Sequence, residues 1–168
     1  MSKRVARLGV FVALAMVFSY IEVLIPFSVG IPGVKLGIAN LVVVTGLYMQ
    51  KPGDVLLISV ARILLVGFLF GNGLSLIYSL AGGLLSYTVM LLLKRCRAFS
   101  VLGVSVAGGV SHNVGQLLAA LFVLRNRSVL YYFPILLVAG VLTGLVIGGL
   151  SNSILKAIDW QGDGLRCL

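Results

Sequence analysis

The chain has 168 residues, of which 60% are hydrophobic and only 10% are charged. A soluble domain is typically about 25% charged, so this composition excludes a water-soluble fold. The formal net charge is +9, but the basic residues adjoin hydrophobic segments, which favours contact with anionic lipid over binding to nucleic acid.

Apolar segments predict six transmembrane helices in one membrane domain, an all-α bundle. Their ranges are about residues 8–25, 35–49, 55–70, 74–93, 101–124 and 135–155. The second segment is short for a complete crossing, so we expect it to begin within a loop or in a locally thin membrane. Residues 51–54 predict a cytoplasmic turn in which Asp54 caps the third helix.

The basic residues at the ends of these helices are unevenly distributed. Only Lys35, Arg125 and Arg127 lie on one side, and the others lie on the side where the chain starts, namely Lys3, Arg4, Arg7, Lys51, Lys94, Arg95, Arg97, Lys156 and Arg166. Cytoplasmic loops carry an excess of Lys and Arg. We therefore expect both termini to be cytoplasmic and the number of spans to be even.

The first helix carries small residues at Ala6, Gly9 and Ala13, which lie on one face at helical spacing. Such a stripe allows another helix to approach closely, either a neighbour within this protein or an external partner. Glu22 lies near the outer end of this helix. It needs a partner or water there, because an unpaired charge in hydrocarbon is unfavourable.

Arg62 lies near the centre of the third segment. It forms either a structural pair with a carbonyl or Glu22, or a clamp for an anion, because a guanidinium matches carboxylate and phosphate groups. In the fourth helix, Tyr78 is either an interfacial anchor or a pocket wall, and Ser79 begins a face of small residues suited to close packing. Glycines at positions 140, 144 and 148 predict a similar face on the sixth helix.

The fifth segment, residues 101–124, concentrates polar side chains near its middle. His112 and Gln116 are four residues apart and therefore share a face, with Asn113 beside them and Ser111 adjacent in sequence. These groups bond either to neighbouring helices or to a ligand. We favour a substrate pocket, because ionisable residues within a membrane are usually functional.

The predicted depths of the polar residues favour one cavity that opens outward and accepts an anionic or amphipathic molecule. The proposed substrate-binding residues are Glu22, Lys35, Asn40, Arg62, Asn72, Tyr78, Ser79, His112, Asn113 and Gln116. The sequence shows neither an intramembrane acidic pair nor a Cys/His group with ligand spacing, so we predict no catalytic site, metal or cofactor. No nucleotide-binding loop is present, which implies a separate energising partner or passive, ion-coupled movement.

Several stretches resemble one bacterial family, heptaprenyl diphosphate synthase component I, also called Gx transporter. They are SYIE at 19–22, KLGIAN at 35–40, Arg62 leading to Gly71, YSLAGG at 78–83 and HNVGQ at 112–116. The likeness covers nearly the whole chain, and the second and fifth stretches are the most specific.

That family is similar to the substrate-binding S components of energy-coupling factor (ECF) transporters. The resemblance implies six helices, cytoplasmic termini, a pocket lidded by outer loops, and a bacterial cytoplasmic membrane. It also implies as partners a small-molecule substrate, a transmembrane coupling protein and cytoplasmic ATPases, with Ala6, Gly9 and Ala13 placed at the coupling interface. These residues depart from the strict Ala-x-x-x-Ala pattern often found there.

The family's two names imply rival functions. We favour an S component over a membrane component of a prenyl diphosphate synthase, which would itself be non-catalytic because the Asp-Asp-x-x-Asp sites of such synthases are missing. A self-sufficient ion-coupled carrier would predict an inverted repeat, which the sequence does not show.

Overall fold

The computed structural model describes residues 2–24, 38–70, 73–96 and 98–160. In these ranges the chain forms six α-helices and one 3-10 helix (η1), with bounds α1 Ser2–Leu24, α2 Asn40–Met49, α3 Pro52–Phe70, α4 Gly73–Arg95, α5 Val101–Leu124, η1 Arg127–Tyr132 and α6 Phe133–Trp160. Five spans are long and apolar enough to cross a membrane, and α2 is a shorter apolar helix. The predicted all-helical, six-helix membrane architecture is confirmed.

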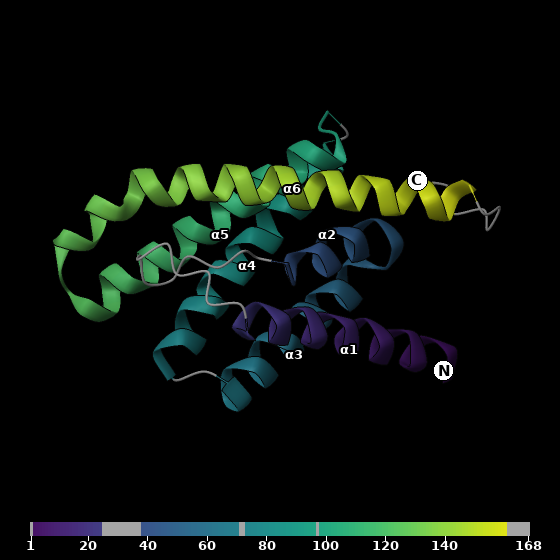
Figure 1. Cartoon of the computed structure of the whole chain (residues 1–168), viewed down its shortest axis with the longest axis horizontal. Helices are drawn as coiled ribbons and strands as arrows, with labels where there is room; N and C mark the ends of the chain where they lie inside the picture. Colours follow the sequence, from purple (N-terminus) through teal and green to yellow (C-terminus); the bar gives the residue numbers. More distant parts are fainter. Residues whose placement is uncertain (1, 25–37, 71–72, 97, 161–168) are drawn as a thin grey trace.

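Helices α3, α4, α5 and α6 pack on one another in chain order (Figure 1). Helix α1 packs on α3, and α2 contacts α1, α3 and α6. The start of α1 and the end of α6 lie at one end of the molecule, and the α5–α6 connection lies at the opposite end. Both helix ends therefore lie on one side of a membrane, as an even number of spans requires.

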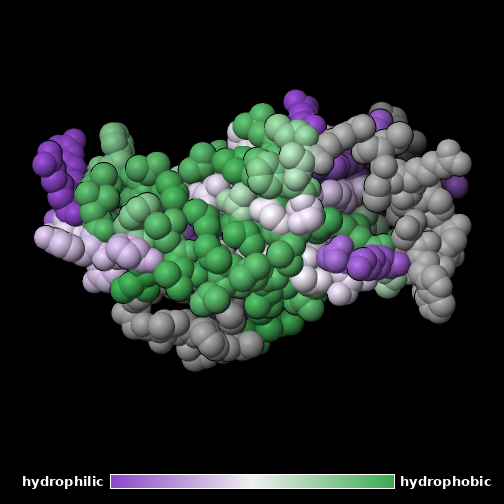
Figure 2. Space-filling model, turned by 90° about the horizontal axis from the view of Figure 1, so that it is seen from above, coloured by the Kyte–Doolittle hydropathy of each residue, from purple (hydrophilic) through white to green (hydrophobic). Residues whose placement is uncertain are grey.

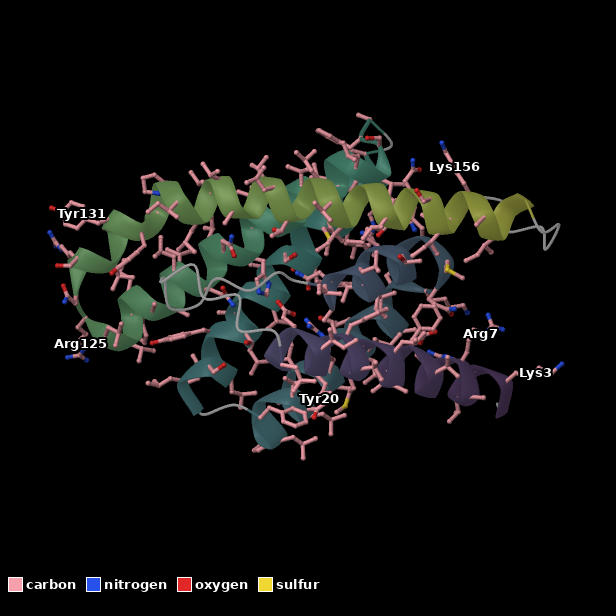
Figure 3. All side chains as sticks on the ribbon, viewed as in Figure 1. Lys3, Arg7, Tyr20, Arg125, Tyr131 and Lys156 are labelled. Atoms are coloured by element: carbon pink, nitrogen blue, oxygen red, sulfur yellow. The ribbon has the colours of Figure 1, made fainter. Side chains whose placement is uncertain are left out.

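Charged and apolar side chains are distributed as a bilayer requires. Figure 3 shows Lys3, Arg7 and Lys156 at the end where α1 begins, and Arg125 at the opposite end. Between the two ends the visible surface is largely hydrophobic (Figure 2). Large apolar side chains such as Phe68 on this surface are exposed, which suits contact with lipid. The excess of basic residues favours a cytoplasmic position for the end where α1 begins, which we call the cytoplasmic end, and we call the opposite end the outer end.

Helix α2 is the centre of the core. All residues from Val42 to Leu47 are buried, so this helix is enclosed on every side. Val43, Val44 and Leu47 belong to one buried cluster with side chains of the four helices that follow, namely Val55, Tyr87, Met90, Val104 and Ile147. A helix that is apolar all round is stable only when it is surrounded in this way.

Helices α5 and α6 approach closely along the predicted glycine face. A Cβ atom added at Gly140 would lie 3.0 Å from the backbone of Gly109, and one at Gly144 would lie 2.6 Å from Val106 Cα. One at Gly148 would lie 2.9 Å from the side chain of Ser105. The expectation that these glycines form a close-packing face is confirmed, because any side chain at them would push the helices apart.

The observed helix bounds differ from the predicted ones at several ends. Helix α1 begins earlier, at Ser2, and α6 continues to Trp160. Residues 38 and 39 form a turn before α2. The predicted turn with Asp54 as cap is wrong: α3 already begins at Pro52, a residue favoured in the first helical position, and the Asp54 carboxylate binds Arg4.

Candidate functional site

Arg62 lies where α1, α2 and α3 meet. Its Nη2 atom donates a long hydrogen bond of 3.5 Å to Asn40 Oδ1 at the start of α2. Its Nε atom is buried and has no hydrogen-bond partner among the described residues. Glu22 is half-buried near the end of α1. The structure thus brings two of the predicted site residues, Arg62 of α3 and Asn40 of α2, into one polar cluster.

The packing below this cluster explains its position. Ala15, Val42 and Ile58 are buried against one another at the interface of α1, α2 and α3. Arg62 lies one turn outward from Ile58, and Glu22 lies two turns outward from Ala15 on the same face of α1. Apolar side chains therefore seal the cytoplasmic side of the cluster.

His112 and Gln116 lie together on α5, as their spacing predicts, and both face α4. A Cβ atom added at Gly82 would lie 2.8 Å from Gln116 Cγ and 3.1 Å from His112 Cε1. The absence of a side chain at Gly82 is therefore what makes room for these two polar residues. Tyr78 and Ser79 lie half-buried on α4, one turn outward from this glycine.

Asn113 and Ser111 make different contacts from these two. The Asn113 Nδ2 atom donates a 2.7 Å hydrogen bond to the carbonyl oxygen of Leu136 on α6. The Ser111 hydroxyl donates to the carbonyl of Ala107, one turn back in its own helix. Both side chains therefore bond to helix backbone, which is the alternative to ligand binding that the sequence left open.

Arg62 and His112 lie at a similar level on either flank of α4. The successive residues Gly82 and Gly83 of α4 contact His112 and Ile63, respectively, and Ile63 adjoins Arg62 on α3. Successive helical positions face about 100° apart, so α3 and α5 approach α4 from different sides. Two other predicted site residues, Lys35 and Asn72, lie outside the described residues.

The small residues of α1 face away from the rest of the described protein. Ala6, Gly9 and Ala13 are all exposed, and a Cβ atom added at Gly9 would have nothing within 4 Å. No helix among the described residues therefore packs against this stripe, as the first of its two interpretations requires. The stripe is open to another molecule.

Contacts at the cytoplasmic end were not predicted from the sequence. Arg4 of α1 forms an ion pair with the buried Asp54 of α3. Two α4 side chains bind the facing ends of α2 and α3. Tyr87 Oη donates to the carbonyl of Pro52, the first residue of α3, and Lys94 Nζ donates to the carbonyl of Leu47 in the last turn of α2, each at 2.6 Å. The partners are 35 or more residues apart in sequence, so no local pattern identifies them.

These features define a multi-pass membrane protein with a charged and amide-containing interior. Within the described ranges, no group of three His, Cys, Asp or Glu residues is arranged to hold a metal ion. The chain belongs to the heptaprenyl diphosphate synthase component I family, whose model matches residues 11–154. No curated protein and no solved structure matches it.

Proposed function

We propose that this protein is the substrate-binding S component of an ECF-type uptake transporter in a bacterial cytoplasmic membrane. The observation that carries the proposal is the Arg62 guanidinium within the span of α3. It donates one long hydrogen bond to Asn40, and its buried Nε atom has no acceptor among the described residues. A buried guanidinium is unfavourable unless it is paired, so such a group suits recognition of an anion.

The length of α2 supports an opening toward the outside. Its 10 residues span about 15 Å, roughly half of the hydrocarbon core. Asn40, at its outer end, is also the residue that contacts Arg62. In the proposal, the ligand lies outward of α2, with Arg62 and Asn40 on one side and His112 and Gln116 on the other, and Lys35, Asn72, Tyr78 and Ser79 nearer the entrance.

The exposed stripe on α1 supports a partner within the membrane. Ala6, Gly9 and Ala13 present little more than backbone to the lipid, which permits close approach of a second helix. In the proposal, this surface binds the transmembrane coupling protein, which in turn binds the ATPases that energise uptake.

Ligand binding tests this proposal directly. The protein is purified in lipid nanodiscs, and small molecules that co-purify are extracted and identified by mass spectrometry. Arg62→Ala and His112→Ala should weaken binding of the identified molecule and leave the elution profile of the folded protein unchanged. Arg127→Ala, which removes an equal charge from the exposed outer end, is the matched control. Parental binding by both pocket variants would show that the site lies elsewhere.

The family name favours a second candidate, a non-catalytic membrane component of a heptaprenyl diphosphate synthase. This function requires a separate catalytic chain as partner. Co-purification from the native membrane, analysed by mass spectrometry, distinguishes the two: an S component retains a membrane coupling protein and ATPases, whereas a synthase component retains a soluble prenyl synthase and alters its turnover.

A further inference from the structure

The connection between α5 and α6 combines charged and apolar side chains at the outer end of the molecule. Figure 3 shows Arg125 and Tyr131 at this tip, both pointing away from the other helices. No residue of η1 is buried, and the side chains of Phe122 and Tyr131 are each 85% exposed. In the space-filling view, hydrophilic and hydrophobic side chains lie next to one another at the same end (Figure 2). The tip therefore offers both kinds of group to a partner.

The two arginines of this tip have no acidic neighbour on their own helices. No Asp or Glu occurs between residues 101 and 158, a range that includes all of α5 and η1. Among the described residues, neither Arg125 nor Arg127 forms an ion pair. Basic residues at the outer end also run against the usual distribution of charge in membrane proteins. Their positive charge can therefore be matched by an anion from outside the chain.

The backbone holds the first of these arginines at the very end of α5. Arg125 caps this helix with φ 50° and ψ 26°, the left-handed conformation in which glycine is usually found. Among the described residues, it is the only one other than glycine with a positive φ. Asn126 then fixes the turn, because its Oδ1 atom accepts from the Ser128 N–H at 2.9 Å. An arginine in a conformation that suits glycine better favours a functional role for its side chain.

The length of α6 places the tip at the level of the lipid headgroups. Its 28 residues span about 42 Å, which exceeds the hydrocarbon core of about 30 Å. Counted outward from the exposed Lys156 at the cytoplasmic end, about 20 residues cross this core, so the core ends near Leu136. Both arginines and η1 lie beyond that point, at the depth where tyrosine rings and long basic side chains meet the headgroups.

We infer that the tip formed by residues 122–133 binds the headgroup phosphate of an anionic lipid in the outer leaflet through Arg125 and Arg127. A guanidinium matches a phosphate with two parallel N–H donors. The exposed side chains of Phe122 and Tyr131 contact the acyl chains and glycerol region of the same lipid layer, which a soluble anion does not provide. The inference is independent of the proposed transport function, because neither arginine belongs to the proposed substrate cavity.

A single fluorescent residue measures lipid selectivity at this tip. In the full chain, Trp160→Phe removes the only tryptophan, and Phe122→Trp places one beside the arginines. This reporter chain is reconstituted in phosphatidylcholine vesicles that also contain a lipid with brominated acyl chains, either phosphatidylglycerol or phosphatidylcholine. Quenching should show a preference for phosphatidylglycerol of at least about fivefold, roughly the factor that one arginine contributes near an anionic surface. A reporter chain without this preference would overturn the inference.

Variants of the reporter chain locate the lipid. Arg125→Gln combined with Arg127→Gln should bring the preference close to unity. Lys3→Gln combined with Lys156→Gln removes the same number of charges from exposed positions at the opposite end and should leave the preference unchanged. Equal loss in both double variants, or full preference in the first, would overturn the inference.

Arg125→Gly separates lipid binding from folding. Glycine suits the left-handed backbone at this position, so the variant should melt at or above the temperature of the reporter chain in phosphatidylcholine and still lose part of the preference. Full preference in this variant would show that Arg125 does not contact the phosphate.

Two further measurements distinguish the lipid from other ligands. Inorganic phosphate, compared with chloride at equal ionic strength, should leave the preference unchanged, and its loss would mean that the tip recognises a soluble anion. Binding of the small molecule that co-purifies with the protein should survive in the Arg125→Gln and Arg127→Gln double variant. Failure of the lipid inference and failure of the proposed function are therefore read from different signals.

Discussion

Replacement of Gly144 by alanine tests how closely α5 and α6 must approach. The added methyl group would lie 2.6 Å from Val106 Cα and 3.0 Å from the Ser105 carbonyl oxygen. Both are backbone atoms, so no rotation of a side chain relieves the overlap and the helices themselves must separate. Overpacking costs about 1–3 kcal/mol in well-packed cores, and contact with backbone places this variant in the upper part of that range.

The expected result is a clear fall in thermal stability. In a chain of this size, 1 kcal/mol corresponds to about 2–4 °C in Tm, so Gly144→Ala should melt roughly 5–10 °C below the parent. The measurement is the loss of the monodisperse peak in size-exclusion chromatography after heating in one detergent.

Gly149 provides the matched control on the same helix. A Cβ atom there would have nothing within 4 Å, and alanine favours a helix over glycine by about 1 kcal/mol. Gly149→Ala should therefore melt at the parental temperature or above it. If the two variants melted within a degree or so of each other, the close α5–α6 contact would not be what stabilises this pair.

Two further predictions concern polar contacts. Arg4→Gln should lower Tm, because it leaves the buried Asp54 carboxylate without its cation. The double variant with Asp54→Asn should recover part of this loss in the same assay. If the Tm changes of the two single variants simply added in the double variant, this pairing would be refuted. Asn113→Leu should lower the free energy of unfolding by about 1–3 kcal/mol, and Tm with it, because it leaves the Leu136 carbonyl without its donor. Gln116→Leu should instead weaken mainly ligand binding, measured by calorimetry. If Gln116→Leu lowered Tm and Asn113→Leu weakened binding, the observed orientation of these side chains would be contradicted.

Composition and periodicity predict the membrane class, the six helices and the glycine face of α6, because each depends on local patterns, whereas the packing of that face on α5 is seen only in the structure. The start of α3 was misplaced because the sequence Lys-Pro-Gly-Asp at 51–54 fits a turn as well as a first helical turn. Only the position of Arg4, 50 residues away, shows what Asp54 binds.

The candidate site was predictable to the extent that it depends on one helix. The four-residue spacing of His112 and Gln116 gives their common face without knowledge of any neighbour. The direction of Asn113 depends on where α6 lies, and the contact of Arg62 with Asn40 depends on how α2 inserts between α1 and α3. Neither arrangement is encoded in local spacing.

The enclosed position of α2 has a consequence for how the protein is made. At 10 residues, α2 is too short to be held across a bilayer by its own apolarity, and the lysine that binds its last turn comes from α4. Its contacts with α6 form only after nearly the whole chain has been synthesised. Insertion of this segment is therefore completed late in biogenesis, and a chain truncated before α6 should leave α2 accessible to quality-control proteases.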